Sequence, residues 1–257
     1  MEIAQLRAKI PAFESMQNYP KAIYYKGDLS LLDRPKVAIV GSRKPNQYAR
    51  TYTHLLASKL ADAGVVVVSG GAIGTDAIAH KAAGASNTIM VAATGLDKRY
   101  PAINKNIIMA IEKDGLVLSQ FEAGTPSQRY NFPIRNELIV ALGAVLVVMY
   151  ADENSGTMRS VAYAQKMKRS IYVLPHRIGE SCATNNLVAK GEAEAIYDID
   201  AFVARFGGEK EQKSDAFISY CQSNPTYEEA LKKFSSRLFE AELNGTIVVR
   251  NGHVYIV

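Results

Sequence analysis

Two loops with the residue types of an anion-binding site each follow a short apolar run. They are Gly41–Pro45, which contains Arg43 and Lys44, and the glycine-rich stretch Ser69–Gly74. Glycine lets a ligand approach the backbone closely, and the helix that each loop opens offers free N–H groups and a partial positive charge. We therefore predict a phosphate-binding edge. Its candidate residues are Gly41, Ser42, Arg43, Lys44, Gly70 and Gly71.

The common nucleotide-binding and catalytic motifs do not occur in the sequence. A dinucleotide fingerprint needs G-x-G-x-x-G and an acidic residue about 20 positions further on. Here the first loop has only Gly41, and the second apolar run ends at Ser69. A Walker A loop, a nucleophile elbow and the zinc-deaminase pattern are also missing. The sequence therefore predicts no P-loop ATPase and shows no constellation of residues that demands catalysis, and the anion must be bound in another way.

Residues 127–136 interleave cations, aromatic rings and amides. Cations pair with phosphates, rings stack on bases and amides bond to base edges, so this mixture is typical of single-stranded nucleic-acid binding. Pro133 favours an extended backbone at Phe132, which would hold the ring outward in a loop. The alternative is that Phe132 and Tyr130 cap the core. The candidate contacts in this stretch are Arg129, Phe132, Arg135 and Asn136.

The composition limits the class of protein. A chain of 257 residues with 48% hydrophobic content suits one large domain and one small domain, and a net charge of +5 permits a nucleic-acid partner without requiring one. The two cysteines and four histidines lack metal-ligand spacing. We therefore expect no metal, no other cofactor and a reducing compartment. No apolar run is long enough for a membrane span or a signal peptide, so we expect no membrane association and a cytoplasmic location.

Alternating apolar runs and helical patterns between residues 37 and 206 must position these loops. Continuous Val and Ile runs are typical of strands buried on both faces. They predict an α/β fold, an extended Rossmann-like parallel sheet with helices on both faces, whose strand-to-helix loops meet at one edge. Strands are predicted at 37–40, 65–68, 88–92, 116–119, 145–149 and 171–174, with a weaker one near 195–197, and helices at 47–63, 75–83, 103–113, 135–142 and 157–167.

The last fifty residues predict a second, small domain. Three helical patterns, at 215–222, 226–233 and 235–243, precede two apolar runs that flank Asn251-Gly252, a strong hairpin signal. Three helices and a hairpin form the plan of a winged-helix-like domain. The last helix is acidic, which favours a protein-facing role over DNA binding. The predicted divisions are an N-terminal extension at 1–36, the Rossmann-like nucleic-acid-binding domain at 37–206, a linker at 207–213 and the winged-helix-like domain at 214–257.

Six motifs occur in a specific order between about residues 20 and 200. They are Tyr24-Tyr25-Lys26-Gly27-Asp28, Val37-Ala38-Ile39-Val40-Gly41-Ser42-Arg43, Ser69-Gly70-Gly71-Ala72-x-Gly74-x-Asp76-x-x-Ala79-His80, Gly95-x-Asp97-x-x-Tyr100-Pro101-x-x-Asn104, Phe132-Pro133-x-Arg135-Asn136 and Ser155-Gly156-Thr157. In this order they resemble the DNA processing protein A family (DprA, also called Smf).

The resemblance implies a non-enzymatic single-stranded DNA-binding protein of natural transformation. Such a protein protects incoming strands, promotes loading of the RecA recombinase and forms a homodimer. The resemblance places Arg43, Arg129 and Phe132 in the DNA-binding pocket, lined by Gly70 and Gly71. Asn136 lies beside them.

Two departures and two alternatives accompany this resemblance. Many family members have a cation at the position of Glu137 and a glycine at that of His176. The stretch Gly70–Thr75 also faintly resembles the P-G-G-x-G-T-x-x-E run of nucleoside-monophosphate phosphoribohydrolases, without its proline and glutamate. That enzyme would release adenine from AMP. The other alternative is a nucleotide-sensing regulator whose winged helix binds duplex DNA.

Overall fold

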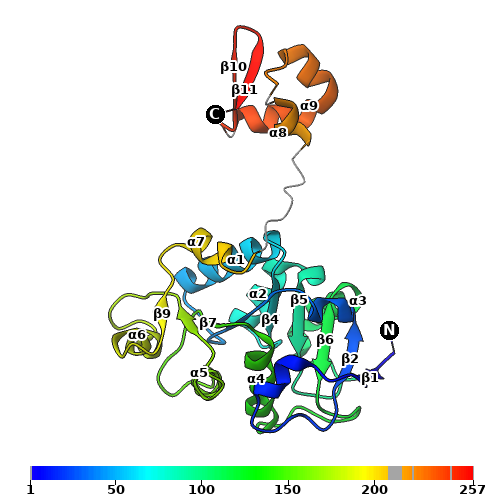
Figure 1. The fold of residues 1–257 in the computed structure, drawn as a ribbon, viewed down its shortest axis with the longest axis vertical. Coiled ribbons are helices and arrows are strands. Elements are labelled where there is room, and N and C mark those ends of the chain that lie inside the picture. The colour runs from blue at the N-terminus through cyan, green and yellow to red at the C-terminus, as the bar shows by residue number, and fades with distance from the viewer. Residues whose placement is uncertain (1, 208–215, 222, 244, 257) are drawn as a thin grey trace. The chain divides into compact units, whose positions relative to one another are not determined.

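The computed structural model describes residues 2–207, 216–221, 223–243 and 245–256. The chain forms two compact units, Met1–Gly208 and Glu209–Val257, which we describe separately (Figure 1). Most of the predicted linker, residues 208–213, lies outside the described residues.

Within the described residues, nine strands of the first unit form one sheet in the order β1-β2-β6-β5-β4-β3-β7-β8-β9. Strands β3 to β9 run parallel, which confirms the predicted α/β architecture. The bounds are β1 Ala4–Gln5, β2 Tyr24–Gly27, β3 Lys36–Val40, β4 Val66–Ser69, β5 Thr88–Val91, β6 Leu116–Ser119, β7 Leu146–Val148, β8 Ile171–Val173 and β9 Glu194–Ala195.

The N-terminal residues join this sheet, which the sequence analysis did not predict. Strand β2 pairs antiparallel with β6, and β1 pairs antiparallel with β2, so the sheet is mixed at this edge. The buried Lys26 of β2 donates a hydrogen bond to the carbonyl of Leu96 at 3.0 Å and lies 3.6 Å from the Glu112 carboxylate. A buried lysine needs such partners, because an unpaired buried charge would destabilise the fold.

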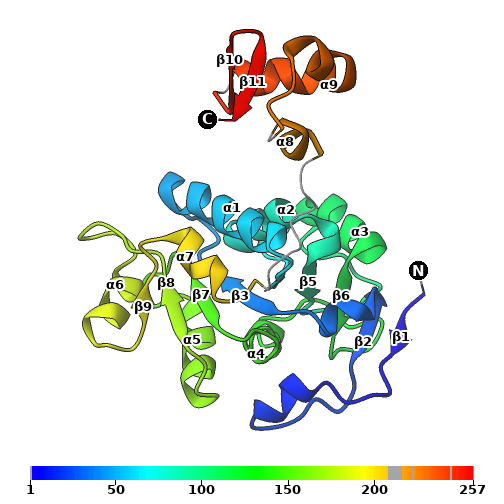
Figure 2. The same cartoon turned by 45° about the horizontal axis from the view of Figure 1, so that its top comes forward.

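Helices cover both faces of the sheet (Figure 2). Alternate residues of β3 face opposite layers. Val37 and Ile39 pack with α1, α2 and α7, while Ala38 and Val40 pack with α4, α5 and α6. The helices are α1 Gln47–Asp62, α2 Thr75–Ala83, α3 Lys105–Asp114, α4 Asn131–Leu142, α5 Thr157–Lys166, α6 Cys182–Ala189 and α7 Ile199–Ala204, with short 3₁₀ segments at Pro11–Ser15, Leu29–Leu32, Ala85–Asn87 and Ala102–Asn104.

Helix α4 begins four residues earlier than predicted, at Asn131. Phe132 and Pro133 therefore lie in its first turn, and the prediction of an extended loop at Phe132 was wrong. Proline is tolerated there because a first-turn N–H has no acceptor within the helix. The ring of Phe132 is thus held by a helix rather than by a loop.

The second unit has two described helices and a hairpin. Helix α8 is Ala216–Cys221, and α9 is Tyr227–Leu243 with non-helical backbone angles at Phe234, where the sequence predicted two separate helices. Strands β10 Ile247–Arg250 and β11 His253–Ile256 pair around Asn251-Gly252, as predicted. The winged-helix assignment stays a prediction. In neither unit is a described helix both long enough and apolar enough to span a membrane.

Candidate nucleic-acid interface

A groove lies at the carboxyl ends of β3, β4 and β5, where loops from several elements meet. It has two adjoining parts that share Arg43, Ala72, Phe132 and Arg135. The first part, which we call the apolar pocket, is also lined by Gly71, Ile73, Met90, Val91, Ala92, Ala93, Tyr100 and Pro101. The second part, the open cleft, has a volume of about 450 Å³ and is also lined by Val40, Gly41, Ser42, Asp76, Asn136, Ile139, Ser155, Gly156, Thr157 and Ser160.

Phe132 stands at the boundary of the two parts and is half-buried. The guanidinium carbon of Arg43 lies 5.4 Å from the centroid of its ring, within the range of a cation–π contact. The ring of Tyr100, which is 45% exposed, lies 6.0 Å away at an interplanar angle of 55°. Phe132 therefore neither caps the core fully nor projects freely, and it presents a supported ring to the groove.

Arg135 lies in the wall of the groove and is only 5% exposed. Its Nη1 donates to the carbonyl of Val91 at 2.6 Å, and its Nε donates to Oδ1 of Asn136 at 3.2 Å. A Cβ at residue 70 would lie 2.2 Å from Nη1, so Gly70 leaves room for this guanidinium. The sequence analysis predicted both residues as DNA contacts. In the structure Arg135 lines the groove while bonding to internal partners, and Gly70 makes room for it; a direct DNA contact by either residue stays a prediction.

Asp76 is the nearby acidic residue of the groove and is 7% exposed. Gly74, and not Asp76, is the N-cap residue of α2, and Oδ2 of Asp76 accepts from the N–H of Ala72 at 3.3 Å. Burial raises the pKa of the Asp76 carboxyl, and the positive charge of Arg135 opposes that rise. The two side chains therefore act on each other as opposite buried charges.

The two glycine-bearing loops are joined to each other. Thr75, the first residue of α2, donates from both its N–H and its Oγ1 to the carbonyl of Ser42, each at 3.1 Å. A Cβ at Gly41 would lie 2.6 Å from Oγ1 of Thr75. The N-terminal turn of α2 is thus partly satisfied inside the protein, whereas the sequence analysis expected it to be free for an anion.

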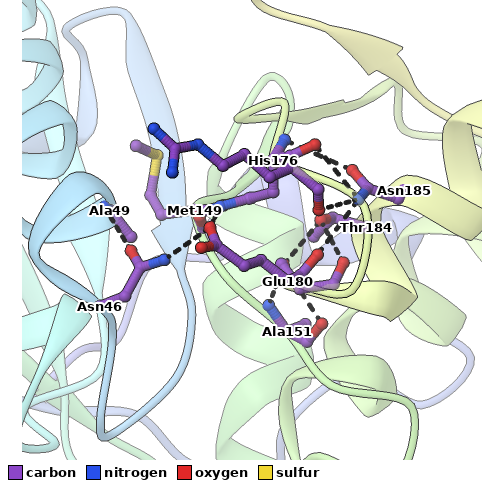
Figure 3. A network of polar contacts seen from close by, with 10 residues as sticks. Asn46, Ala49, Met149, Ala151, His176, Glu180, Thr184 and Asn185 are labelled. Atoms are coloured by element: carbon purple, nitrogen blue, oxygen red, sulfur yellow. Dashed lines mark hydrogen bonds and ion pairs between the residues drawn. The ribbon is translucent and has the colours of Figure 1, made fainter.

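A polar network fixes the far end of the loop that carries Arg43 (Figure 3). Asn46 caps α1 by accepting from the N–H of Ala49 at 2.8 Å, and its Nδ2 donates to Oε2 of Glu180 at 3.0 Å. The buried ring of His176 donates from Nε2 to the carbonyl of Met149 at 2.8 Å and lies 3.9 Å from the same carboxylate. His176, at a position where a glycine is common in the family, therefore anchors this side of the groove.

Glu137, the other departure, faces away from the groove. It lines a separate surface pocket with Gln17 and Lys166. Burial raises the pKa of its carboxyl, while a hydrogen bond from the backbone of Gln17 opposes the rise. Glu137 thus contacts the N-terminal extension.

The predicted site residues separate into three groups. Gly41, Ser42, Arg43, Gly71, Phe132, Arg135 and Asn136 line the groove. Gly70 lies behind its wall, while Lys44 and Arg129 are exposed near it without lining either part. The residues predicted to bind DNA did not include Tyr100 or those that begin α5. The motif Ser155-Gly156-Thr157 could have indicated the residues that begin α5, but nothing in the sequence indicated Ser160.

The part of the chain that the structure describes contains no group of three or more His, Cys, Asp or Glu residues able to hold a metal ion. The groove offers guanidinium groups, aromatic rings, amides and hydroxyls. Such a set binds phosphates and bases.

Comparisons with known proteins identify the family of the chain. A family model described as DNA recombination-mediator protein A matches residues 7–207. Protein Smf of Synechocystis sp. is 35% identical over 73% of this chain and 49% of its own length, and DNA processing protein DprA of Streptococcus pneumoniae is 36% identical over 67% and 62%. The chain therefore spans about half to three-fifths of the length of these curated relatives.

A solved structure extends the comparison. DNA processing protein A of Helicobacter pylori, described for its single-stranded DNA-binding mode, is 40% identical with a TM-score of 0.77 and covers 79% of this chain and 95% of that one. The resemblance drawn from the six motifs is thus confirmed. The chain belongs to the DNA recombination-mediator protein A family.

Proposed function

We propose that the groove binds single-stranded DNA and that the protein acts as a recombination mediator without catalytic chemistry of its own. The observation that carries the proposal is the supported ring of Phe132, with the guanidinium carbon of Arg43 5.4 Å from its centroid, at the boundary of an open cleft. A ring can stack on any base because every base has a flat face, and a cation beside it pairs with the strand's phosphates.

The single-stranded DNA-binding mode of the Helicobacter pylori relative supports this proposal. We extend the proposal to the cellular role that the family resemblance implies. The protein would bind incoming strands in the cytoplasm during natural transformation, protect them, and promote loading of RecA as a homodimer.

The phosphoribohydrolase alternative has less support. The glycine-rich stretch that suggested it packs against internal groups, since Gly70 abuts Arg135 and a Cβ at Gly71 would lie 2.8 Å from Sδ of Met90. Asp76 is buried and partnered. We therefore expect no free adenine when the protein is incubated with AMP. Release of adenine at a rate proportional to protein would favour the enzyme.

The direct test is a titration with fluorescent single-stranded and double-stranded DNA of equal length at several salt concentrations, without ATP. We expect tighter binding of the single strand, and we expect the logarithm of the binding constant to fall linearly with the logarithm of the salt concentration. Lys113→Ala is a matched control, because Lys113 is exposed at the C-terminal end of α3, away from the carboxyl edge of the sheet. Preferential binding of the duplex would contradict the proposal and favour the duplex-binding regulator.

A further inference from the structure

We infer that the first turn of α5 binds one phosphodiester of the DNA strand through neutral hydrogen-bond donors. The inference rests on the proposed function, since it names a second contact between the same strand and the same groove. The site consists of Ser155, Gly156, Thr157 and Ser160, which line the open cleft beside the Arg43–Phe132 pair.

The backbone at the start of α5 leaves donors unused. The N–H of Ser155 bonds to the carbonyl of Asp152, and that of Met158 bonds to the carbonyl of Ser155. Among the described residues no acceptor meets the N–H groups of Gly156 and Thr157, and no side chain caps the helix. Unused N–H groups and the helix dipole together favour an anion at this place.

Two hydroxyl groups at the same place are also without partners. Ser160 is 1% exposed, yet within the described chain its Oγ has no hydrogen-bond partner, and the same holds for the buried Oγ of Ser155. Buried polar groups in native proteins are nearly always paired, so an unpaired one calls for an explanation. A phosphate, rich in acceptor oxygens, would supply partners for both hydroxyls and for the two backbone N–H groups.

Gly156 keeps this place open although the fold does not require glycine there. Its angles of φ −60° and ψ −21° lie in the helical region that any residue adopts, and an added Cβ would meet no atom within 4 Å. Neither the backbone conformation nor the packing therefore explains why this residue is a glycine. Gly156 lines the cleft, so a side chain at this position would occupy space that a ligand of the cleft could use.

The charges around the site are compatible with a phosphate. Arg43 lines the same cleft. Three acidic residues lie at or near the site. Asp76 lines the cleft, but its carboxylate accepts a hydrogen bond from Ala72 and its charge is balanced by Arg135. Glu153 accepts a hydrogen bond from Nδ2 of Asn186 at 2.9 Å, and Asp152 is exposed. Because the donors on α5 are neutral, this contact should add affinity without adding to the salt dependence, which counts neutralised phosphates.

Ser160→Ala is the decisive variant. Alanine removes an unpaired buried hydroxyl, so the variant should melt at the same temperature as the parent or above it. It should nevertheless bind oligothymidylate about tenfold more weakly with an unchanged salt slope, as expected for one lost bond to a charged acceptor. Gly156→Ala should also fold normally and bind more weakly. Ser170→Ala, at an exposed position just beyond the other end of α5, is the control and should bind like the parent.

A backbone-modified strand identifies the ligand as a phosphate. In a set of oligothymidylates, each carries a single neutral methylphosphonate at a different linkage. At one linkage, methylphosphonate substitution should lower the affinity of the parent more than it lowers the affinity of Ser160→Ala, because the variant has already lost that contact. Equal sensitivity of the two proteins at every linkage would overturn the inference, as would parental affinity in Ser160→Ala. If single-strand binding depends on Arg43 and Phe132 but not on Ser160, only this inference fails. If the parent does not bind single strands, the proposed function fails as well.

Discussion

Replacing Arg135 by methionine should destabilise the fold rather than remove a direct DNA contact. The guanidinium donates to the carbonyl of Val91 at 2.6 Å and lies close enough to Asp76 to influence its ionisation. Methionine has a similar length but keeps neither interaction. The Val91 carbonyl then loses its charged donor, and the Asp76 carboxylate loses the positive charge that offsets its burial.

The size of the effect follows from these two losses. A hydrogen bond to a charged group contributes about 1.5–3 kcal/mol, and removing one member of a buried charge pair costs about 3–5 kcal/mol in total. We therefore expect the free energy of unfolding to fall by about 3–5 kcal/mol. For a unit of this size the melting temperature should fall by roughly 6–20 °C, at about 2–4 °C per kcal/mol.

The assay is thermal and urea unfolding of Arg135→Met, of Asp76→Asn and of the double variant. The double variant should recover part of the loss, because the asparagine side chain carries no charge that needs compensation. The deficit of Arg135→Met should also narrow as pH falls, since protonation of Asp76 removes the uncompensated charge. If Arg135→Met is as stable as the parent and yet binds single strands much more weakly, Arg135 is a DNA contact and this reasoning is wrong.

Three further predictions follow from the groove and its surroundings. Phe132→Ala should weaken single-strand binding by about 1–3 kcal/mol and leave the salt slope nearly unchanged. Arg43→Ala should weaken binding to all sequences and lower the salt slope by roughly one unit or less. Equal salt slopes in the two variants would contradict the assigned roles. Truncation after Gly208 should leave most of the single-strand affinity intact, because α9 exposes Glu240 and Glu242; loss of most binding at an unchanged oligomeric state would refute this. Burial lowers the pKa of His80 from 6.5 to about 4, so the folded protein resists a proton that the unfolded chain accepts, and stability should decrease by about 3 kcal/mol as pH falls from 6.5 to 4. A His80→Asn variant with an equally steep loss over that range would show that other groups titrate there.

The sheet was predictable because its strands are buried on both faces. Val66–Ser69 and Leu116–Ser119 are fully buried, and burial on both faces leaves a continuous apolar run in the sequence. Strand β2 has no such run, since it reads Tyr-Tyr-Lys-Gly. It pairs with β6, and its buried Lys26 is accommodated by Glu112 and by the carbonyl of Leu96, which lie far along the chain and meet Lys26 only in the folded protein.

The roles of the arginines were harder to predict for the same reason. Arg43 lies in the loop after β3 and Arg135 lies near the start of α4, and the exposure of neither side chain can be read from the residues around it. The structure leaves Arg43 exposed beside the ring of Phe132 and buries Arg135 in the groove wall. The difference arises because Gly70 leaves space for Arg135 and Asp76 supplies the opposite charge; Gly70 follows β4 and Asp76 lies in the first turn of α2, both far from Arg135 in the sequence.

The groove therefore combines two sets of residues, which we call the floor and the rim. The floor consists of Arg135, Thr75 and Ser42, which are held by internal hydrogen bonds, and the rim consists of Phe132 and Arg43. Below the surface, Arg135 and the Thr75–Ser42 hydrogen bonds tie the loops after β3, β4 and β5 into one arrangement. A rigid base of this kind lets Phe132 and Arg43 hold their places before a ligand arrives, so little ordering free energy is lost on binding. A variant that loosens the floor should consequently weaken DNA binding through disorder of the rim, and lowering the temperature should restore that binding. A variant of the rim itself should bind weakly at every temperature.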